Sequence, residues 1–198
     1  MKRLSLVSLS LLLLIAVFAV SVWAAAPPTM NSRIIDGQRA TYAIAGAANT
    51  PAATPTDVVT LYGSATKTIA VRKVIVSGMA TTAGSMDVVL TKRTAANTAG
   101  TSTAPSIAKF SSNDGTATAT PALYTANPSA LGTGIALAEK KLNFGVAGAA
   151  GVVEFDFTNA TGKPVYLIGA TQGLAINLNG GTVPTGGTFG YTVIWEEF

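Results

Sequence analysis

Two carboxylates in the C-terminal third of the chain have a spacing that acid–base chemistry could use. Glu154 and Asp156 are two residues apart in an alternating segment, so a strand would hold both on one face, about 6–7 Å apart at roughly 3.3 Å per residue. Such a pair is compatible with a glycosidase. The same pattern describes a solvated polar face opposite Val153, Phe155 and Phe157, and we favour this second interpretation.

Asp114 is a candidate oxygen ligand within a turn. It lies between Asn113 and Gly115, which are residue types that favour tight turns. Calcium takes about six to eight oxygen ligands, and no run of alternating acidic residues surrounds Asp114 to supply them. We therefore expect a plain turn without a metal.

Two aromatic residues near the C-terminus could recognise a sugar. Tyr191 and Trp195 share one face of a predicted strand with Phe189 and Val193. On an exposed face they would form a platform for stacking against a sugar ring. Aromatic residues that alternate along a strand are more often part of the core, and we favour that interpretation.

Five basic residues lie on what we expect to be adjacent strands. On an exposed surface they could contact an acidic partner, a phosphate or a lipopolysaccharide. Lysine and arginine also keep strands soluble and discourage pairing at sheet edges, and we favour this structural interpretation. The five residues are Lys67, Arg72, Lys73, Lys92 and Arg93.

The composition excludes several kinds of site. The chain has no cysteine and no histidine, so it can form no disulfide, no Ser-His-Asp triad and no Cys/His zinc site. With only 9 acidic residues, carboxylate catalysis has few candidate groups, and we expect a non-enzymatic protein without cofactor or metal. The net charge of +4 includes Lys2 and Arg3 of the N-terminal segment, which leaves too weak a bias for nucleic-acid binding.

Residues 1–26 are interpreted as a secretory signal peptide. Lys2 and Arg3 precede an apolar run from Leu4 to Val22, and Val22-Trp23-Ala24 provides the small residues that a signal peptidase recognises. The alternative is an uncleaved membrane anchor, because about 19 apolar residues are just long enough to span a bilayer. The chain would then touch a membrane only through residues 1–26.

The remaining chain divides into an arm and a β-rich domain. Residues 27–55 are rich in Ala, Pro and Thr and are predicted to form an extended arm. Residues 56–198 contain short segments with period-2 alternation, separated by Gly, Pro and Asn turns. The expected strands lie at 58–62, 68–77, 86–91, 118–124, 135–144, 152–157, 164–168, 174–178 and 189–195.

These elements predict an all-β fold, an antiparallel two-sheet sandwich that follows the N-terminal hydrophobic segment. About eight strands without a helical pattern favour a jelly-roll-like arrangement over an immunoglobulin-like one, although alternation does not give the strand order. Two charged neighbours, Arg72 and Lys73, interrupt the alternation of their strand, which predicts a β-bulge there.

Several blocks of the sequence carry a resemblance to a known group of proteins. They are residues 56–97, 124–128 (Tyr-Thr-Ala-Asn-Pro), 172–180 (Gln-Gly-Leu-Ala-Ile-Asn-Leu-Asn-Gly) and 193–197 (Val-Ile-Trp-Glu-Glu). In this order they resemble small, mostly uncharacterised proteins encoded among the structural genes of tailed phages and prophages. The resemblance implies a β-sandwich virion accessory protein, such as a decoration or fibre protein.

We therefore expect a structural or assembly protein, either a phage virion accessory or a related exported surface protein. Charged residues make up only 11% of the chain, against about a quarter in ordinary proteins, which suits a packed assembly or an extracellular protein. We expect self-association as a homo-oligomer, docking on a larger particle, or both. The location would be the periplasm, the exterior, the cell surface or the virion. The alternative is a secreted module that binds carbohydrate or another surface ligand.

Overall fold

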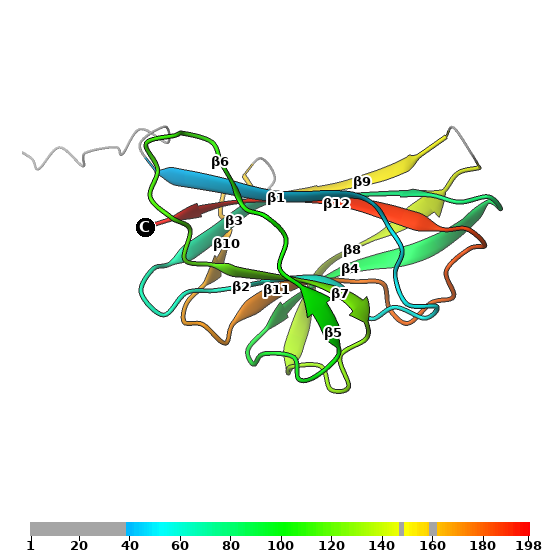
Figure 1. Cartoon of the computed structure of the whole chain (residues 1–198), viewed down its shortest axis with the longest axis horizontal. Helices are drawn as coiled ribbons and strands as arrows, with labels where there is room; N and C mark the ends of the chain where they lie inside the picture. Colours follow the sequence, from blue (N-terminus) through cyan, green and yellow to red (C-terminus); the bar gives the residue numbers. More distant parts are fainter. Residues whose placement is uncertain (1–38, 147–148, 159–161) are drawn as a thin grey trace, which may run out of the picture. The chain divides into compact units, whose positions relative to one another are not determined.

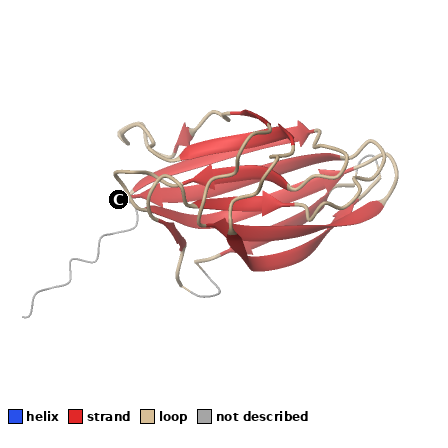
Figure 2. Cartoon of the chain, turned by 90° about the horizontal axis from the view of Figure 1, so that it is seen from below, coloured by secondary structure: helices blue, strands red, loops and turns tan. Residues whose placement is uncertain are grey.

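The computed structural model describes residues 39–146, 149–158 and 162–198. Within these ranges the chain forms twelve strands and no helix. The strands make two antiparallel sheets of six strands each, which face each other as the two layers of a sandwich (Figures 1 and 2). The predicted all-β, two-sheet antiparallel fold is confirmed.

The first sheet, called sheet A, has the strand order β10-β3-β12-β1-β6. Strand β9 lies on the same side of β3 as β10 and pairs with residues 73–78 of β3, whereas β10 pairs with residues 69–71. Its two longest neighbours, β3 and β12, pair along nearly their whole length. The bounds of the strands in sheet A are β1 Ala40–Asn49, β3 Ile69–Met79, β6 Ala108–Lys109, β9 Gly151–Asp156, β10 Val165–Leu167 and β12 Thr188–Glu197.

The second sheet, sheet B, has the order β5-β7-β2-β11-β4-β8. Strand β8 forms one edge, and the three-residue strand β5 forms the other. The bounds of its strands are β2 Asp57–Tyr62, β4 Gly84–Arg93, β5 Thr101–Thr103, β7 Thr120–Ala126, β8 Gly134–Phe144 and β11 Gly173–Asn177.

The core lies between the two sheets and follows the predicted alternation. In β12 the side chains of Phe189, Tyr191, Val193 and Trp195 point inward and are at most 4% exposed. Trp195 stacks on Tyr42 of the neighbouring strand β1 with the ring centroids 5.8 Å apart. The preference of β-branched and aromatic residues for a half-buried pleated surface explains why these segments form strands.

The predicted bulge at Arg72 and Lys73 is confirmed. Ile194 pairs with Lys73, and the next residue, Trp195, pairs with Val71. Arg72 is therefore the extra residue that the bulge accommodates. Because of it, the hydrophobic residues on either side of the charged pair both face the core.

Part of the expected arm belongs to the sandwich. Residues 40–49 form β1, which pairs with β12 on one side and with β6 on the other. The sequence signal is weak because only Tyr42 and Ile44 bring large side chains to the core, while Ala and Gly occupy most of the other positions. Residues 1–38, including the predicted leader, lie outside the described residues. Among the described residues, no helix is long and apolar enough to cross a bilayer.

Candidate interaction surface

A buried polar network occupies the side of sheet B that faces away from the core. Asp57 is fully buried and accepts two hydrogen bonds from Arg93, from Nε at 3.0 Å and from Nη2 at 2.6 Å. The side-chain amides of Asn97 and Asn177 donate to the same carboxylate at 2.8 and 2.6 Å. Arg93 also donates to the carbonyl oxygen of Gly132. The network therefore ties two loops to the sheet and leaves Asp57 no role as a free acid.

The second buried carboxylate belongs to Glu197 at the end of β12. It accepts hydrogen bonds from Ala119 N at 3.0 Å, Trp195 Nε1 at 3.1 Å, and both the backbone N and the Oγ1 of Thr118. Burial alone would raise the pKa of Glu197, but these hydrogen bonds outweigh it and lower the pKa below its usual value. Lys67 lies 3.4 Å from the same carboxylate. Glu197 is thus an ionised anchor for the segment before β7.

The neighbouring Glu196 is the third buried carboxylate among the described residues, and it pairs with two arginines. Arg72 approaches to 2.6 Å and Arg39 to 3.4 Å. Arg39 also lies over the ring of Phe198, 4.6 Å from its centroid. All three carboxylates are therefore used to hold segments of the fold together.

The five predicted basic contact residues do not form one patch. Lys67, Arg72 and Lys73 lie on or next to β3 of sheet A, whereas Lys92 and Arg93 lie on β4 of sheet B. The sequence suggested adjacent strands because the two segments are consecutive, but the chain crosses between the layers at that point. Arg93 is buried, and Lys73 pairs with Glu154 at 2.8 Å.

Glu154 and Asp156 lie on the outer face of β9, and the interpretation of this pair as part of a solvated polar face is confirmed. Glu154 is exposed and pairs with Lys73, and Asp156 accepts hydrogen bonds from the backbone N and the Oγ1 of Thr158. Val153 and Phe155 point into the core. Asp156 is thus engaged in a local turn, and Glu154 in a surface ion pair.

The turn predicted around Asp114 is confirmed, and its carboxylate serves the fold. Asp114 N donates to the carbonyl oxygen of Ser111, and Asp114 Oδ2 accepts from the backbone N of Thr41 at 3.2 Å. Among the described residues, no group of three or more acidic side chains is placed to hold a metal ion.

The aromatic residues that could have formed a sugar platform are largely buried. Trp195 is 0% and Tyr191 4% exposed, so the core interpretation is confirmed. Tyr124 is also buried, and its hydroxyl lies 2.9 Å from that of Tyr62. Tyr166 packs edge-on against Phe198. Tyr62 and Tyr166 are half-buried, so among these residues Tyr191, Trp195 and Tyr124 are the ones removed from an exposed sugar platform.

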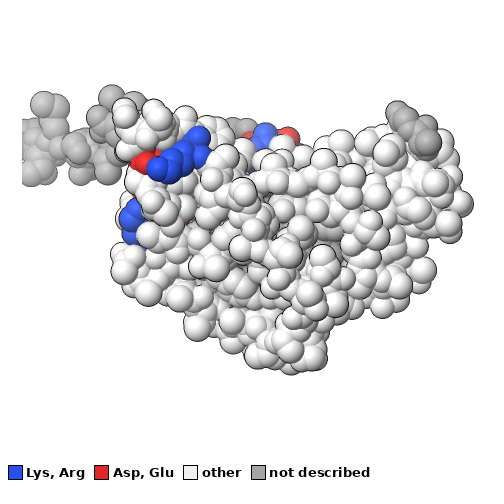
Figure 3. Space-filling view, in the orientation of Figure 1, with Lys and Arg blue, Asp and Glu red and all other residues white. Residues whose placement is uncertain are grey.

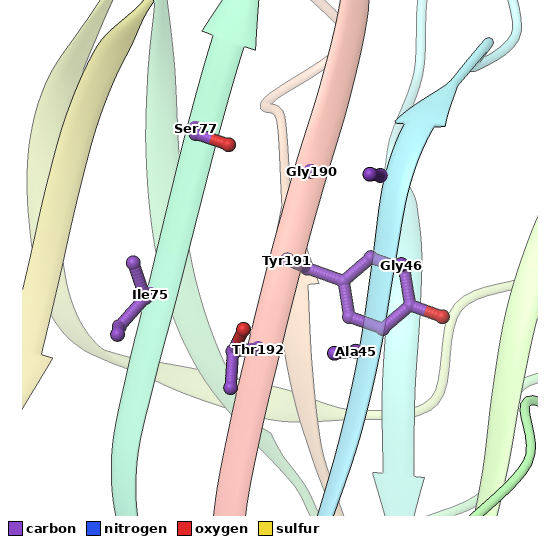
Figure 4. Close-up of a pocket in the computed structure, with 8 residues that line it drawn as sticks. Ala45, Gly46, Ile75, Ser77, Gly190, Tyr191 and Thr192 are labelled. Carbon is purple, nitrogen blue, oxygen red and sulfur yellow. The ribbon is translucent and has the colours of Figure 1, made fainter.

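The outer face of sheet A contains two adjoining shallow hollows that the sequence did not predict. The larger, of about 360 Å³, runs over β12 between β1 and β3 (Figure 4). The smaller, of about 240 Å³, continues it toward the end of β3 and shares Ala47, Ser77 and Gly190 with it. Small side chains surround both hollows: Ala45, Gly46, Ala47, Ala48, Ser77, Gly78, Ala150 and Gly190.

Tyr191 and Gly46 explain how β1 and β12 fit together beside the larger hollow. Tyr191 extends from β12 across to β1, next to Gly46 (Figure 4). A Cβ atom on Gly46 would lie 2.7 Å from Cε1 of this ring, closer than real Cβ contacts. Glycine at position 46 is therefore needed for the ring to lie against the strand. Burial of the ring also raises the pKa of the Tyr191 hydroxyl.

The rim of the hollows is largely apolar, and the Lys73–Glu154 ion pair lies at one side of it, where Glu154 is opposite Ile75. Val152 of β9 is 61% exposed and Met79 of β3 is 40% exposed. The segments that line the hollows, 45–48, 75–79, 150–152 and 188–192, contain no charged residue. In the view of Figure 3, charged side chains gather mainly at the end of the sandwich where β12 ends, and most of the remaining surface is uncharged. Exposed apolar surface of this kind suits contact with another protein surface.

Sequence reasoning missed this surface because alanine, glycine and serine carry little pattern of their own. The hollows arise from cross-strand neighbours that only the register reveals. Comparisons of the chain with protein-family models, with curated proteins and with solved structures each found no match.

Proposed function

We propose that this chain is a non-enzymatic assembly protein with a jelly-roll fold, which works by self-association. The nested strand pairing supports the jelly roll. β1 pairs with β12, β2 with β11, β3 with β9 and β10, and β4 with β8. In a jelly roll the first strand pairs with the last, the second with the last but one, and so on. The chain then forms one long hairpin that winds around a barrel.

The observation that carries the functional proposal is the outer face of sheet A. It combines hollows floored by small residues with exposed Val152 and Met79, and the charges of Lys73 and Glu154 beside them are paired with each other. Such a face is costly to leave in water and well suited to a packed interface. The buried carboxylates support the non-enzymatic part, because Asp57, Glu196 and Glu197 are each engaged by cations and other donors.

The setting that we propose is a virion accessory, such as a decoration or fibre protein, or a related exported surface protein. The blocks that resemble tailed-phage proteins support the first. The apolar leader over residues 1–26 supports the second. The low content of charged residues suits both.

Intact mass and light scattering on each cell fraction test this proposal. The full-length chain is expressed in a bacterium and recovered from medium, periplasm, membrane and cytoplasm. A defined oligomer that begins near Ala25 and lies in the periplasm or medium would support an exported assembly protein. An unprocessed oligomer in the cytoplasm would support the virion setting. A species that remains monomeric at all concentrations would contradict the proposal.

A further inference from the structure

We propose that the end of the sandwich where β1 begins and β12 ends docks on a membrane surface that carries anionic lipid. This inference goes beyond the proposed self-association, which uses another part of sheet A. It also extends to the sandwich itself the membrane contact that was expected only of residues 1–26. The docking residues, called the end patch, are Arg39, Phe110, Tyr166, Ile168 and Phe198.

The register of sheet A brings two aromatic members of the end patch into one outward row. Tyr166 of β10 and Glu196 of β12 both pair with Ala70 of β3. Glu196 pairs with Thr41 of β1, and the backbone N of Phe110 donates to the carbonyl oxygen of Thr41. On β10, β3, β12 and β1 the residues next to this row lie in the core. The row therefore faces away from the core.

The other apolar members of the end patch lie just beyond the strands. Phe198 follows β12 and exchanges two backbone hydrogen bonds with Thr68, of 2.8 and 3.2 Å. The ring of Tyr166 packs edge-on against that of Phe198, with the centroids 6.2 Å apart. Ile168 follows β10 and is 65% exposed, while Phe110 is 64% and Phe198 50% exposed. Three large exposed hydrophobic side chains thus gather at the end of the sandwich where the C-terminus lies (Figure 1).

The charges at this end are layered, with the cations outside and the carboxylates beneath. Arg39 and Arg72 share the single carboxylate of Glu196, which leaves one positive charge in excess. The side chain of Glu196 is 8% exposed, against 24% and 18% for the two arginines. Lys67 and Glu197 repeat this arrangement, with 34% and 0%. A surface that approaches this end therefore meets positive groups first, although an acid beneath holds each of them.

Aromatic and cationic side chains together match the boundary between lipid headgroups and acyl chains. Rings favour this boundary, and arginine keeps its charge among the headgroups while its stem lies along apolar surface. Arg39 lies over the Phe198 ring, 4.6 Å from its centroid, so both kinds of group meet at one point. An acidic protein would use the cations but would gain nothing from exposed Ile168 and Phe110. An anionic membrane uses both.

The N-terminal part of the chain joins the sandwich at the end patch. Arg39 is the first described residue, and the sixteen residues 23–38 separate it from the apolar run Leu4 to Val22. Sixteen extended residues span at most about 55 Å. While the apolar run is in a bilayer, as an anchor or before cleavage of a signal peptide, the end patch is kept near that bilayer at a high effective concentration.

Fluorescent labels test which part of the sandwich meets lipid. The chain has no cysteine, so Ile168→Cys and Ser102→Cys each carry a single environment-sensitive dye. The full-length variants are mixed with vesicles of phosphatidylcholine, with or without phosphatidylglycerol. The dye at position 168 should shift to the blue with the anionic vesicles, and less with phosphatidylcholine alone. The dye at position 102, on the exposed edge strand β5 of sheet B, should not shift.

Three results of this experiment would contradict the proposal. An unshifted dye at position 168 would show that the sandwich stays clear of the lipid, even where the apolar run has inserted. Equal shifts at positions 168 and 102 would show contact without a defined surface. Equal shifts at position 168 with both kinds of vesicle would show that the cations do not select anionic lipid.

Acidic substitutions in the end patch test the same contact. Phe110→Glu and Phe198→Glu, made together in the labelled I168C chain, should lower the ratio of docked to undocked sandwich at least about tenfold, because apolar contact is lost and the anionic surface repels both carboxylates. The matched control is Ile135→Glu with Leu137→Glu on β8, where both side chains are also exposed, and its ratio should not change. Circular dichroism checks that both variants fold. Equal effects of the two pairs would contradict the proposal.

This inference and the proposed self-association can fail separately. Light scattering without lipid measures self-association, and the dye at position 168 measures lipid contact. A chain that forms a defined oligomer without a blue shift on anionic vesicles contradicts this inference alone. A chain that shows the shift but stays monomeric contradicts the proposed function alone. A blue shift that appears on oligomerisation without lipid would assign the end patch to contact between copies and overturn the inference.

Discussion

Arg93 and Asp57 form a bidentate pair that joins the end of β4 to the start of β2, with Nη2 and Oδ1 2.6 Å apart and both residues buried. Between the two strands lies β11, where Gly173 pairs with Arg93 and Ala175 with Thr60. The small residues of β11 leave room for the arginine to cross the sheet. The fork shape of the guanidinium matches a carboxylate in a way that a lysine ammonium does not.

Removal of one partner of this pair should strongly destabilise the protein. Asp57→Asn leaves the Arg93 charge buried without its counter-ion, and we expect a loss of about 3–5 kcal/mol in the free energy of unfolding. Urea denaturation followed by fluorescence measures the loss. The matched control is Asp87→Asn, which breaks the exposed pair with Lys141 and should cost much less, because solvent screens an exposed ion pair. Equal losses in the two variants would contradict the structural role of Asp57.

The buried Glu197 predicts how stability depends on acid. Its pKa in the folded protein is lowered from the ordinary value of 4.5. It therefore contributes stability that is fully present above pH 4.5 and is lost as the pH falls through the lower, folded pKa. Glu197→Gln should be less stable than the unaltered chain near neutral pH, and its stability should fall less steeply on acidification. Denaturation curves over a series of pH values measure both slopes.

Asp87 provides the comparison for this pH experiment. Its pKa is also lowered, first by the hydrogen bond from Lys141 and then by one from Asn179, but the pair is exposed. Asp87→Asn should therefore change the acid slope less than Glu197→Gln does. An unchanged slope in Glu197→Gln would show that this carboxylate does not link stability to pH.

A methyl group at position 46 should be poorly tolerated. Gly46→Ala would push a Cβ atom into the Tyr191 ring, and overpacking of this kind costs about 1–3 kcal/mol. Thermal unfolding measures the difference. The control is Gly115→Ala, because no atom lies within 4 Å of a Cβ built there; this variant should unfold near the temperature of the unaltered chain. A stable Gly46→Ala would show that β1 and β12 can separate slightly at low cost.

Replacement of the two outward carboxylates of β9 should have little effect. The double variant Glu154→Gln with Asp156→Asn loses an exposed ion pair and a local turn contact, so we expect a change of at most about 1–2 kcal/mol. Neither the unaltered chain nor the variant should cleave glycans. Glycan cleavage by the unaltered chain that disappears in the variant would restore a hydrolase function.

Much of the fold could be predicted from the sequence because burial leaves a period-2 signal. Phe189, Tyr191, Val193 and Trp195 alternate with small or polar residues, and the structure places all four in the core. The bulge at Arg72 could also be predicted from the sequence, because two adjacent charged residues cannot both fit the alternation of one strand. The long strands β3, β4, β8 and β12 lie close to their expected ranges.

Other parts of the fold left no such signal. β1 is rich in Ala and Gly, and β5 and β6 have three and two residues, too few for a period to show. The pairing of Asp57 with Arg93 depends on β11 lying between β2 and β4, and alternation does not encode strand order. The hollows over Gly190 likewise depend on the register between β1, β12 and β3 and on the small size of the residues that line them.

The position of β12 in the middle of sheet A has a consequence for biosynthesis. It pairs with β1, more than a hundred residues earlier, and β11 likewise separates β2 from β4 in the other layer. Neither layer can close until these two late strands have left the ribosome, and such high contact order makes folding slow. We therefore expect both sheets to stay incomplete until synthesis of the chain is nearly finished.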